Sequence, residues 1–171
     1  MTAQYRETLT YNGKEYGLAT EPLKPYLNEH GFKFYAWCTA CWRGYTGNWI
    51  IENDKLYLVG FHGWVLETSG DNHNFHAVDM NYLFPGQEKV FAEWFTGEIR
   101  IPHGEMLQYY HMGYASVYEK ELYLEFKNGC LVGQREIENS GSSPKNELFD
   151  MLDYVKKEAV FRRENVKVDN I

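Results

Sequence analysis

The chain has 171 residues, which suits one well-buried domain and is short for two. Aromatic residues make up 17% of it, and this favours a β-rich fold, because aromatic side chains suit a half-buried sheet. The formal net charge of −7 argues against a nucleic-acid binder and against docking on an anionic membrane, since both need a basic face.

The first part of the chain is predicted to form a hairpin and a short helix. Residues 5–18 alternate in polarity around Asn12-Gly13, the strongest short signal for a hairpin turn. A helix is expected over residues 22–30, because two prolines suit its first turn and Gly31 suits its end.

The middle of the chain is predicted to contain strands, a loop and a second helix. Residues 49–59 indicate a hairpin that turns at Glu52-Asn53-Asp54, and residues 60–66 a further strand. The polar residues 69–74 are typical of a loop. Residues 87–96 space their apolar side chains on one helical face, which predicts a short amphipathic helix.

The last part is predicted to return to strands and to end in a helix. Strands are expected at residues 98–102 and 106–110, and a hairpin over 121–138 turns at Asn128-Gly129. Apolar residues at helical spacing predict an amphipathic helix over 145–163.

These elements predict a single α+β domain. Its body, residues 1–144, is expected to hold a mostly antiparallel, curved or barrel-like sheet with short helices. The helix over 145–163 is expected to pack on this body, and 164–171 to form a tail. Gly47-Asn-Trp49 is similar to the Gly-x-Trp of lipocalin-type barrels, whose Trp closes one end of the barrel; a Trp that simply packs in the core explains it as well.

The location and the partner classes follow from charge and hydropathy. We expect a cytoplasmic protein, because no apolar stretch resembles a signal segment or approaches the ~20 residues that span a bilayer. We expect no cofactor, because no stretch carries a specific cofactor motif. Residues 145–171 hold equal numbers of acidic and basic residues, so the net charge of −7 belongs to residues 1–144. A basic protein or a cationic ligand would complement this charge, although solubility alone also accounts for it.

One candidate metal site combines two pairs of ligands. Cys38 and Cys41 form a C-x-x-C, and His73 and His76 form the nearest second pair. A zinc site needs four converging ligands, so a Cys2His2 site is geometrically possible. The alternative is two inert thiols in an aromatic core, and the sequence favours that alternative because the spacing between the pairs is unusual.

The densest candidate binding residues lie in two segments, 40–45 and 109–118. Each interleaves aromatic residues with glycine and one basic or titratable group, and Tyr, Trp and Arg dominate binding hot spots. If both segments line one concave face, they could hold a ligand or a partner's side chain; otherwise they are irregular parts of a Tyr-rich core. The candidate residues are Trp42, Arg43, Tyr45, Tyr110, His111, Tyr114 and Tyr118.

An enzymatic alternative uses some of the same residues. A small hydrolase-type site would join Arg43, His111 and Glu119, with Glu105 as a further candidate, and it requires these side chains within hydrogen-bond reach of one another. The chain has no nucleophile elbow and no phosphate-binding glycine loop. The sequence therefore favours a non-catalytic role.

Several motifs together resemble a known family. Thr39-Ala-Cys-Trp-Arg-Gly-Tyr-Thr-Gly-Asn-Trp49, Val90-Phe-Ala-Glu-Trp-Phe-Thr-Gly97 and His111-Met-Gly-Tyr114 are similar to motifs of a family of hypothetical bacterial proteins. Lys55-Leu-Tyr-Leu-Val59 and Arg100-Ile-Pro102 extend the likeness, which covers roughly residues 10–138. The resemblance implies no activity, so the function is predicted from the residues alone. We expect an acidic binding protein that recognises a basic protein, as immunity or antitoxin-type inhibitors do, or a small ligand.

Overall fold

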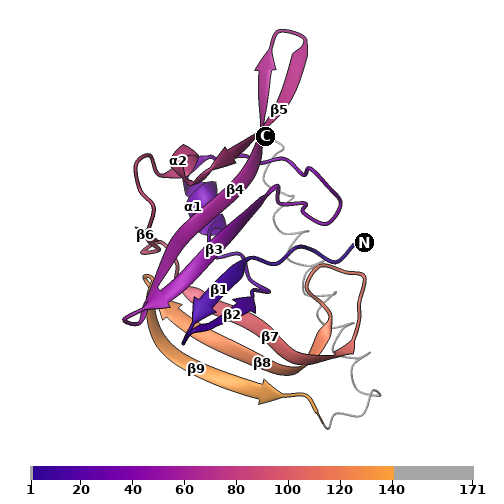
Figure 1. Ribbon diagram of the computed structural model, residues 1–171, viewed down its shortest axis with the longest axis vertical. Coiled ribbons are helices and arrows are strands. Elements are labelled where there is room, and N and C mark those ends of the chain that lie inside the picture. The colour runs from indigo at the N-terminus through magenta and orange to yellow at the C-terminus, as the bar shows by residue number, and fades with distance from the viewer. Residues whose placement is uncertain (1, 141–171) are drawn as a thin grey trace, which may run out of the picture. The chain divides into compact units, whose positions relative to one another are not determined.

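The computed structural model describes residues 2–140, which form a mostly β fold built on one mixed sheet (Figure 1). Within these residues the sheet has nine strands, and two short helices accompany it. The strands are β1 (Thr8–Tyr11), β2 (Lys14–Gly17), β3 (Tyr45–Glu52), β4 (Lys55–Ser69), β5 (Asn72–Asp79), β6 (Val90–Phe91), β7 (Gly97–Gln108), β8 (Val117–Lys127) and β9 (Cys130–Glu138). The helices are α1 (Lys24–His30) and α2 (Met80–Leu83).

The strand order is β2-β1-β3-β4-β9-β8-β7, and β5 and β6 each pair with β4. All pairs are antiparallel except β1 with β3, which run parallel with Leu9 opposite Trp49. The long strand β4 thus holds the sheet together. The sheet is not a closed barrel, so the barrel-like form of the prediction is wrong. Trp49 packs in the core, as the alternative to the likeness to lipocalins predicts.

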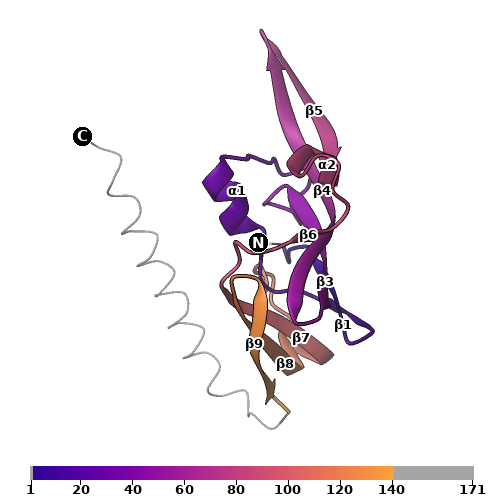
Figure 2. The same ribbon diagram turned by 90° about the vertical axis from the view of Figure 1, so that its left-hand side faces the viewer.

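The core lies between the two parts of the bent sheet. Figure 1 shows β7, β8 and β9 crossing below β1 and β2, and Figure 2 shows α1 on one side of β3 and β4. The backbone N–H of Ala19 donates to the Arg100 carbonyl at 2.9 Å, which brings the chain after β2 against β7. The fully buried apolar side chains include Leu9, Trp49, Leu56, Leu58, Ile99, Ile101, Leu124 and Phe126.

The three hairpin turns and the first helix are confirmed. Asn12 and Gly13 both have positive φ, as a tight two-residue hairpin turn requires, and Asn128-Gly129 repeats this geometry. The helix predicted over 22–30 is α1, which ends at Gly31 with φ +70°.

The helix predicted over 87–96 is wrong. Val90 and Phe91 form β6, and the Ala92 N–H donates to the Leu56 carbonyl at 2.9 Å. Their backbone groups therefore pair with β4, and Val90 and Ala92 are buried there. The spacing of the apolar residues suits a helix and a strand equally, and the strand forms because its backbone can pair with β4.

The loop predicted over 69–74 is also wrong. β4 continues to Ser69, the chain turns at Gly70, and β5 pairs back along β4. Nearly every residue of β5 is exposed, so it has no alternating apolar pattern from which to predict a strand. The separate strands predicted at 98–102 and 106–110 are one strand, β7, and residues 60–66 continue β4.

The helix predicted over 145–163 and the tail over 164–171 lie outside the described residues. Among residues 2–140, neither helix has the length or hydropathy to cross a membrane.

Candidate binding site

A buried carboxylate, Glu7, lies at the centre of the candidate site. It shares the inward face with Leu9 two residues later, and its side chain is 1% exposed. The Trp49 indole Nε1 donates a hydrogen bond of 2.6 Å to Glu7 Oε2. Glycine at position 47 permits this approach, because a Cβ there would lie 2.7 Å from Glu7 Oε2. The Gly47-x-Trp49 motif thus accommodates a buried acid.

Arg43 connects this carboxylate to the rest of the site. Its side chain is 7% exposed, and its Nε lies 3.4 Å from Glu7 Oε1. Its Nη1 donates to the Tyr5 carbonyl at 2.8 Å and to the Tyr114 hydroxyl at 2.7 Å. The Tyr114 hydroxyl in turn donates to Glu21 Oε1 at 3.4 Å. The structure therefore brings the two predicted segments together at Arg43 and Tyr114.

The protonation states follow from burial. Burial raises the pKa of Glu7 from 4.5 to about 7, although Arg43 and Trp49 act in the opposite direction. Burial is the largest single influence and lowers the pKa of Arg43, but Glu7, Tyr114, Cys41 and Glu21 together outweigh it, so the net pKa is raised and Arg43 stays charged. Burial also raises the pKa values of Tyr45 and Tyr114, so both remain protonated donors.

Residues 3–5 lie between the two predicted segments and bind to both. The Tyr5 N–H donates to the Ala40 carbonyl at 2.7 Å, and the Trp42 N–H donates to Gln4 Oε1 at 2.8 Å. On the other side, the Gln4 N–H donates to the Gly113 carbonyl at 3.2 Å. This N-terminal stretch therefore fixes the spacing between the loop before β3, residues 31–44, and the loop after β7, residues 109–116.

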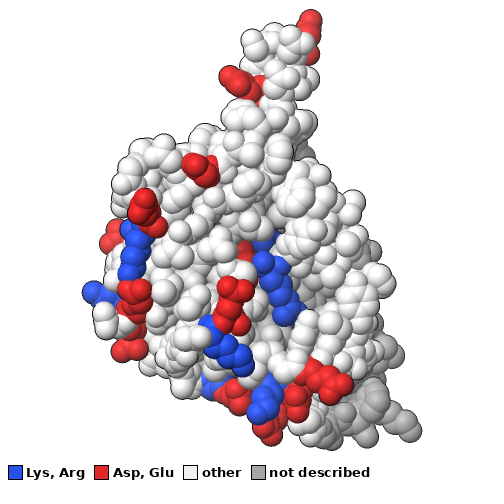
Figure 3. Space-filling view, viewed as in Figure 1, with Lys and Arg blue, Asp and Glu red and all other residues white. Residues whose placement is uncertain are grey.

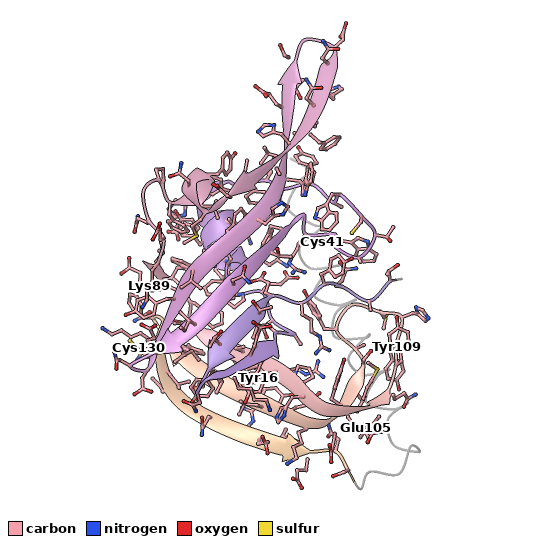
Figure 4. All side chains as sticks on the ribbon, viewed as in Figure 1. Tyr16, Cys41, Lys89, Glu105, Tyr109 and Cys130 are labelled. Atoms are coloured by element: carbon pink, nitrogen blue, oxygen red, sulfur yellow. The ribbon has the colours of Figure 1, made fainter. Side chains whose placement is uncertain are left out.

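These three segments expose several large aromatic side chains. Tyr5, Trp37, Trp42 and Tyr109 are each about half exposed, and we call them the aromatic surface. Residues 34–42 and 106–118 contain no Asp, Glu, Lys or Arg. Figure 3 shows a broad uncharged region on the right of the molecule, and Figure 4 places Cys41 and Tyr109 on this side, with Glu105 below Tyr109.

Three of the predicted binding residues do not reach Arg43. Tyr110 takes part in a loop closure, in which its backbone N–H donates to Ser116 Oγ at 3.1 Å. His111 lies against Tyr109, with ring centroids 4.7 Å apart. Tyr118 lies under the guanidinium of Arg6, whose Cζ is 4.7 Å from the centroid of the Tyr118 ring.

The residues of the enzymatic alternative have separate partners. Arg43 binds Glu7 and its neighbours, and His111 lies beside Tyr109. Glu119 accepts a hydrogen bond of 3.4 Å from the Glu105 N–H. Among residues 2–140, no hydrogen bond joins Arg43, His111 and Glu119, and a general acid–base site needs such contacts.

The candidate metal ligands lie in two different elements. Cys38 and Cys41 belong to the loop before β3, where the Cys41 thiol donates to the Tyr45 carbonyl at 3.4 Å, and burial raises its pKa. His73 and His76 lie on β5, where their nearest polar partners come from β4. In the described part of the chain, no three His, Cys, Asp or Glu side chains are placed to hold a metal ion.

An open groove of about 430 Å³ adjoins the aromatic surface and shares Trp42 with it. It lies between α1 and two short stretches near the ends of the loop before β3, residues 32–35 and 42–45. Its lining includes five aromatic residues and three cations, with Glu21 as the one carboxylate among the described lining residues. These are Phe32, Phe34, Tyr35, Trp42 and Tyr45, and Lys24, Lys33 and Arg43.

Sequence reasoning missed Glu7, Glu21 and the groove itself, of whose lining it named Trp42, Arg43 and Tyr45. One signal was available for Glu7: in the alternating first strand, it shares the face of Leu9 and Tyr11 and so points inward. No local signal marks Glu21, because its contact with Tyr114 joins residues that are distant in the sequence.

Comparison with family models, with curated proteins and with solved structures found no match in any of the three. The resemblance to hypothetical bacterial proteins stays a prediction, as does the cytoplasmic location.

Proposed function

We propose that the protein is a non-catalytic binding protein that recognises a basic protein partner through the aromatic surface, as immunity or antitoxin-type inhibitors do. The observation that carries the proposal is the exposure of Tyr5, Trp37, Trp42 and Tyr109 on three segments that are joined by hydrogen bonds, two of which carry no formal charge. Soluble proteins seldom expose such aromatic clusters without a binding role, and Tyr and Trp are enriched in the energetic centres of interfaces.

The supports of this surface favour a preorganised site. Gln4 and Tyr5 bind the loops on both sides, and Arg43 donates to Tyr5 and Tyr114. A surface fixed before binding loses less conformational entropy when the partner docks. Because Arg43 uses its Nη1 in these internal contacts, its role in the proposal is to position the aromatic residues.

The charge distribution supports a basic partner. Residues 1–144 carry the net charge of −7, whereas residues 34–42 and 106–118 carry no formal charge. An acidic body accelerates the encounter with a basic protein, and an uncharged contact area is desolvated at little electrostatic cost. The acidic body would steer the partner to the protein, and the uncharged area would form the contact.

A paired-variant capture experiment tests the proposal. The full chain is immobilised and exposed to a lysate of its source organism, and compared with a Trp37→Ala/Tyr109→Ala variant; neither residue lines the groove. We expect a basic protein to bind the wild type and to be lost from the variant, with an association rate constant that falls as salt is added.

The matched control is Val132→Ser/Ile137→Ser, which removes exposed apolar side chains from β9 instead. It should retain the partner. Equal capture by the wild type and the Trp37→Ala/Tyr109→Ala variant would contradict the proposal, as would capture of acidic proteins alone.

A further inference from the structure

We infer that the groove beside α1 is a binding site for a planar organic anion, such as an aromatic carboxylate. This site goes beyond the proposed protein partner and does not depend on it. Two unpartnered polar groups in the wall of the groove carry the inference, and the aromatic lining and local charge define the ligand.

The first observation is that two buried donors lack partners. Arg43 and Tyr45 both line the groove, and their side chains are more than nine-tenths buried. Within the described residues, Arg43 Nη2 and the Tyr45 hydroxyl have no hydrogen-bond partner. Buried donors in native proteins are nearly always satisfied, so an absent acceptor is expected at this position.

The ionisation of these groups fixes the type of acceptor. Arg43 is charged and can only donate, and burial keeps the Tyr45 hydroxyl protonated by raising its pKa, so one acceptor group can satisfy both. The guanidinium carbon lies 5.5 Å from the centroid of the Tyr45 ring, so the two groups are neighbours. A carboxylate can accept from both at once.

The charge of the lining also favours an anion. Lys24 forms an ion pair with Glu21 at 3.6 Å, and Arg43 lies beside Glu7. Lys33 is exposed at the groove and has no acidic partner among residues 2–140. The groove is therefore locally cationic on a protein whose net charge is −7.

The body of the ligand follows from the walls. Phe34, Tyr35 and Trp42 contribute aromatic side chains to the lining of the groove, and Tyr35 and Trp42 are exposed. Its volume of about 430 Å³ falls within the range of small-molecule sites. A flat ring stacks on such side chains, while its carboxylate turns toward Arg43 and Tyr45.

Fluorescence titration of the full chain tests this site with two matched probes. One is 8-anilinonaphthalene-1-sulfonate, an anion with a planar naphthalene ring, and the other is its uncharged analogue N-phenyl-1-naphthylamine. We expect the anion to bind at least about tenfold more tightly than the uncharged probe. Equal affinities would overturn the inference.

Variants locate the site. Tyr45→Phe removes only the unpartnered hydroxyl, and Lys33→Gln removes an exposed charge, so both should fold. We expect each to weaken anion binding, Tyr45→Phe by about tenfold, and to leave binding of the uncharged probe unchanged.

Two controls separate the groove from its surroundings. Tyr11→Phe removes a hydroxyl that donates to Gln134 at 3.0 Å, and Trp37→Ala removes part of the aromatic surface outside the groove. Both should leave anion binding unchanged. Loss of binding in Trp37→Ala with full binding in Tyr45→Phe would overturn the inference and identify adsorption on the aromatic surface.

Discussion

At the scale of the residue, Glu7 and Arg43 determine the chemistry of the candidate site. Glu7 is enclosed by β1 and β3, and it accepts from Trp49 while it faces Arg43. Removing either partner of a buried ion pair leaves the other charge uncompensated. The negative charge of Glu7 can also be removed by protonation, because a carboxyl with a pKa of about 7 becomes partly neutral near physiological pH.

The first prediction concerns the pH dependence of stability. Folding raises the pKa of Glu7 from 4.5 to about 7, so the folded state holds this proton more tightly than the unfolded chain. The contribution of Glu7 to the free energy of unfolding is therefore largest below pH 4.5. It decreases as pH rises to about 7, by roughly 3 kcal/mol. In Glu7→Gln this decrease should disappear.

Urea unfolding between pH 4 and 8.5, followed by tryptophan fluorescence, measures the effect. Other groups titrate equally in both proteins, so the difference between wild type and Glu7→Gln isolates Glu7. Parallel pH profiles for the two proteins would show that the carboxyl titrates at its ordinary pKa.

At the scale of the element, the loop over residues 31–44 depends on Gly44 where it enters β3. Gly44 has φ +74°, and a Cβ at this position would lie 2.5 Å from the Tyr35 backbone nitrogen. The Tyr35 N–H donates to the Trp64 carbonyl at 2.8 Å, and the Trp64 N–H donates to the Gly44 carbonyl at 3.0 Å. Both ends of the loop are thus held on β4, and this places Arg43.

The second prediction compares two glycines with nearly the same backbone angle. Gly13→Ala introduces strain from φ +72° but meets no atom within 4 Å, so we expect a loss of about 1 kcal/mol in the free energy of unfolding. Gly44→Ala adds a collision with backbone, so we expect a loss of about 3 kcal/mol. Chemical denaturation measures both. Equal losses would mean that the close approach to Tyr35 is absent.

At the scale of the whole described body, the two ends of the sheet are linked by hydrogen bonds just after β2. The Ala19 N–H donates to the Arg100 carbonyl, and the Arg100 N–H donates to Thr20 Oγ1 at 2.9 Å. These bonds connect the hairpin of β1 and β2 to β7 although the barrel does not close. They keep the apolar interior between the two parts covered.

The third prediction tests this link. Thr20→Val keeps the shape of the side chain but removes the acceptor of the Arg100 N–H, so we expect a loss of roughly 1–2 kcal/mol in the free energy of unfolding. Thr10→Val on β1 is the control, since no described hydrogen bond uses the Thr10 hydroxyl. Thermal unfolding of both variants decides the matter, and a Thr20→Val variant as stable as the control would disprove the link.

The sequence by itself determined the local elements of this protein. Asn12-Gly13 and Asn128-Gly129 adopt positive φ at low energetic cost, so these turns follow from their residues alone, and Gly31 ends α1 for the same reason. Only the tertiary structure decided β5 and β6, because both form by backbone pairing with β4. In β6 this pairing outweighs a helical apolar pattern, and β5 forms although its sequence has no apolar pattern.

The candidate site shows the same division. The sequence indicated Trp42, Arg43, Tyr45 and Tyr114 through their residue types. Only the tertiary structure placed Glu7 beside Arg43, because β1 pairs in parallel with β3, a strand distant in the sequence. Such contacts require the closure of long chain segments, and no short motif encodes the burial of a charge that results from them.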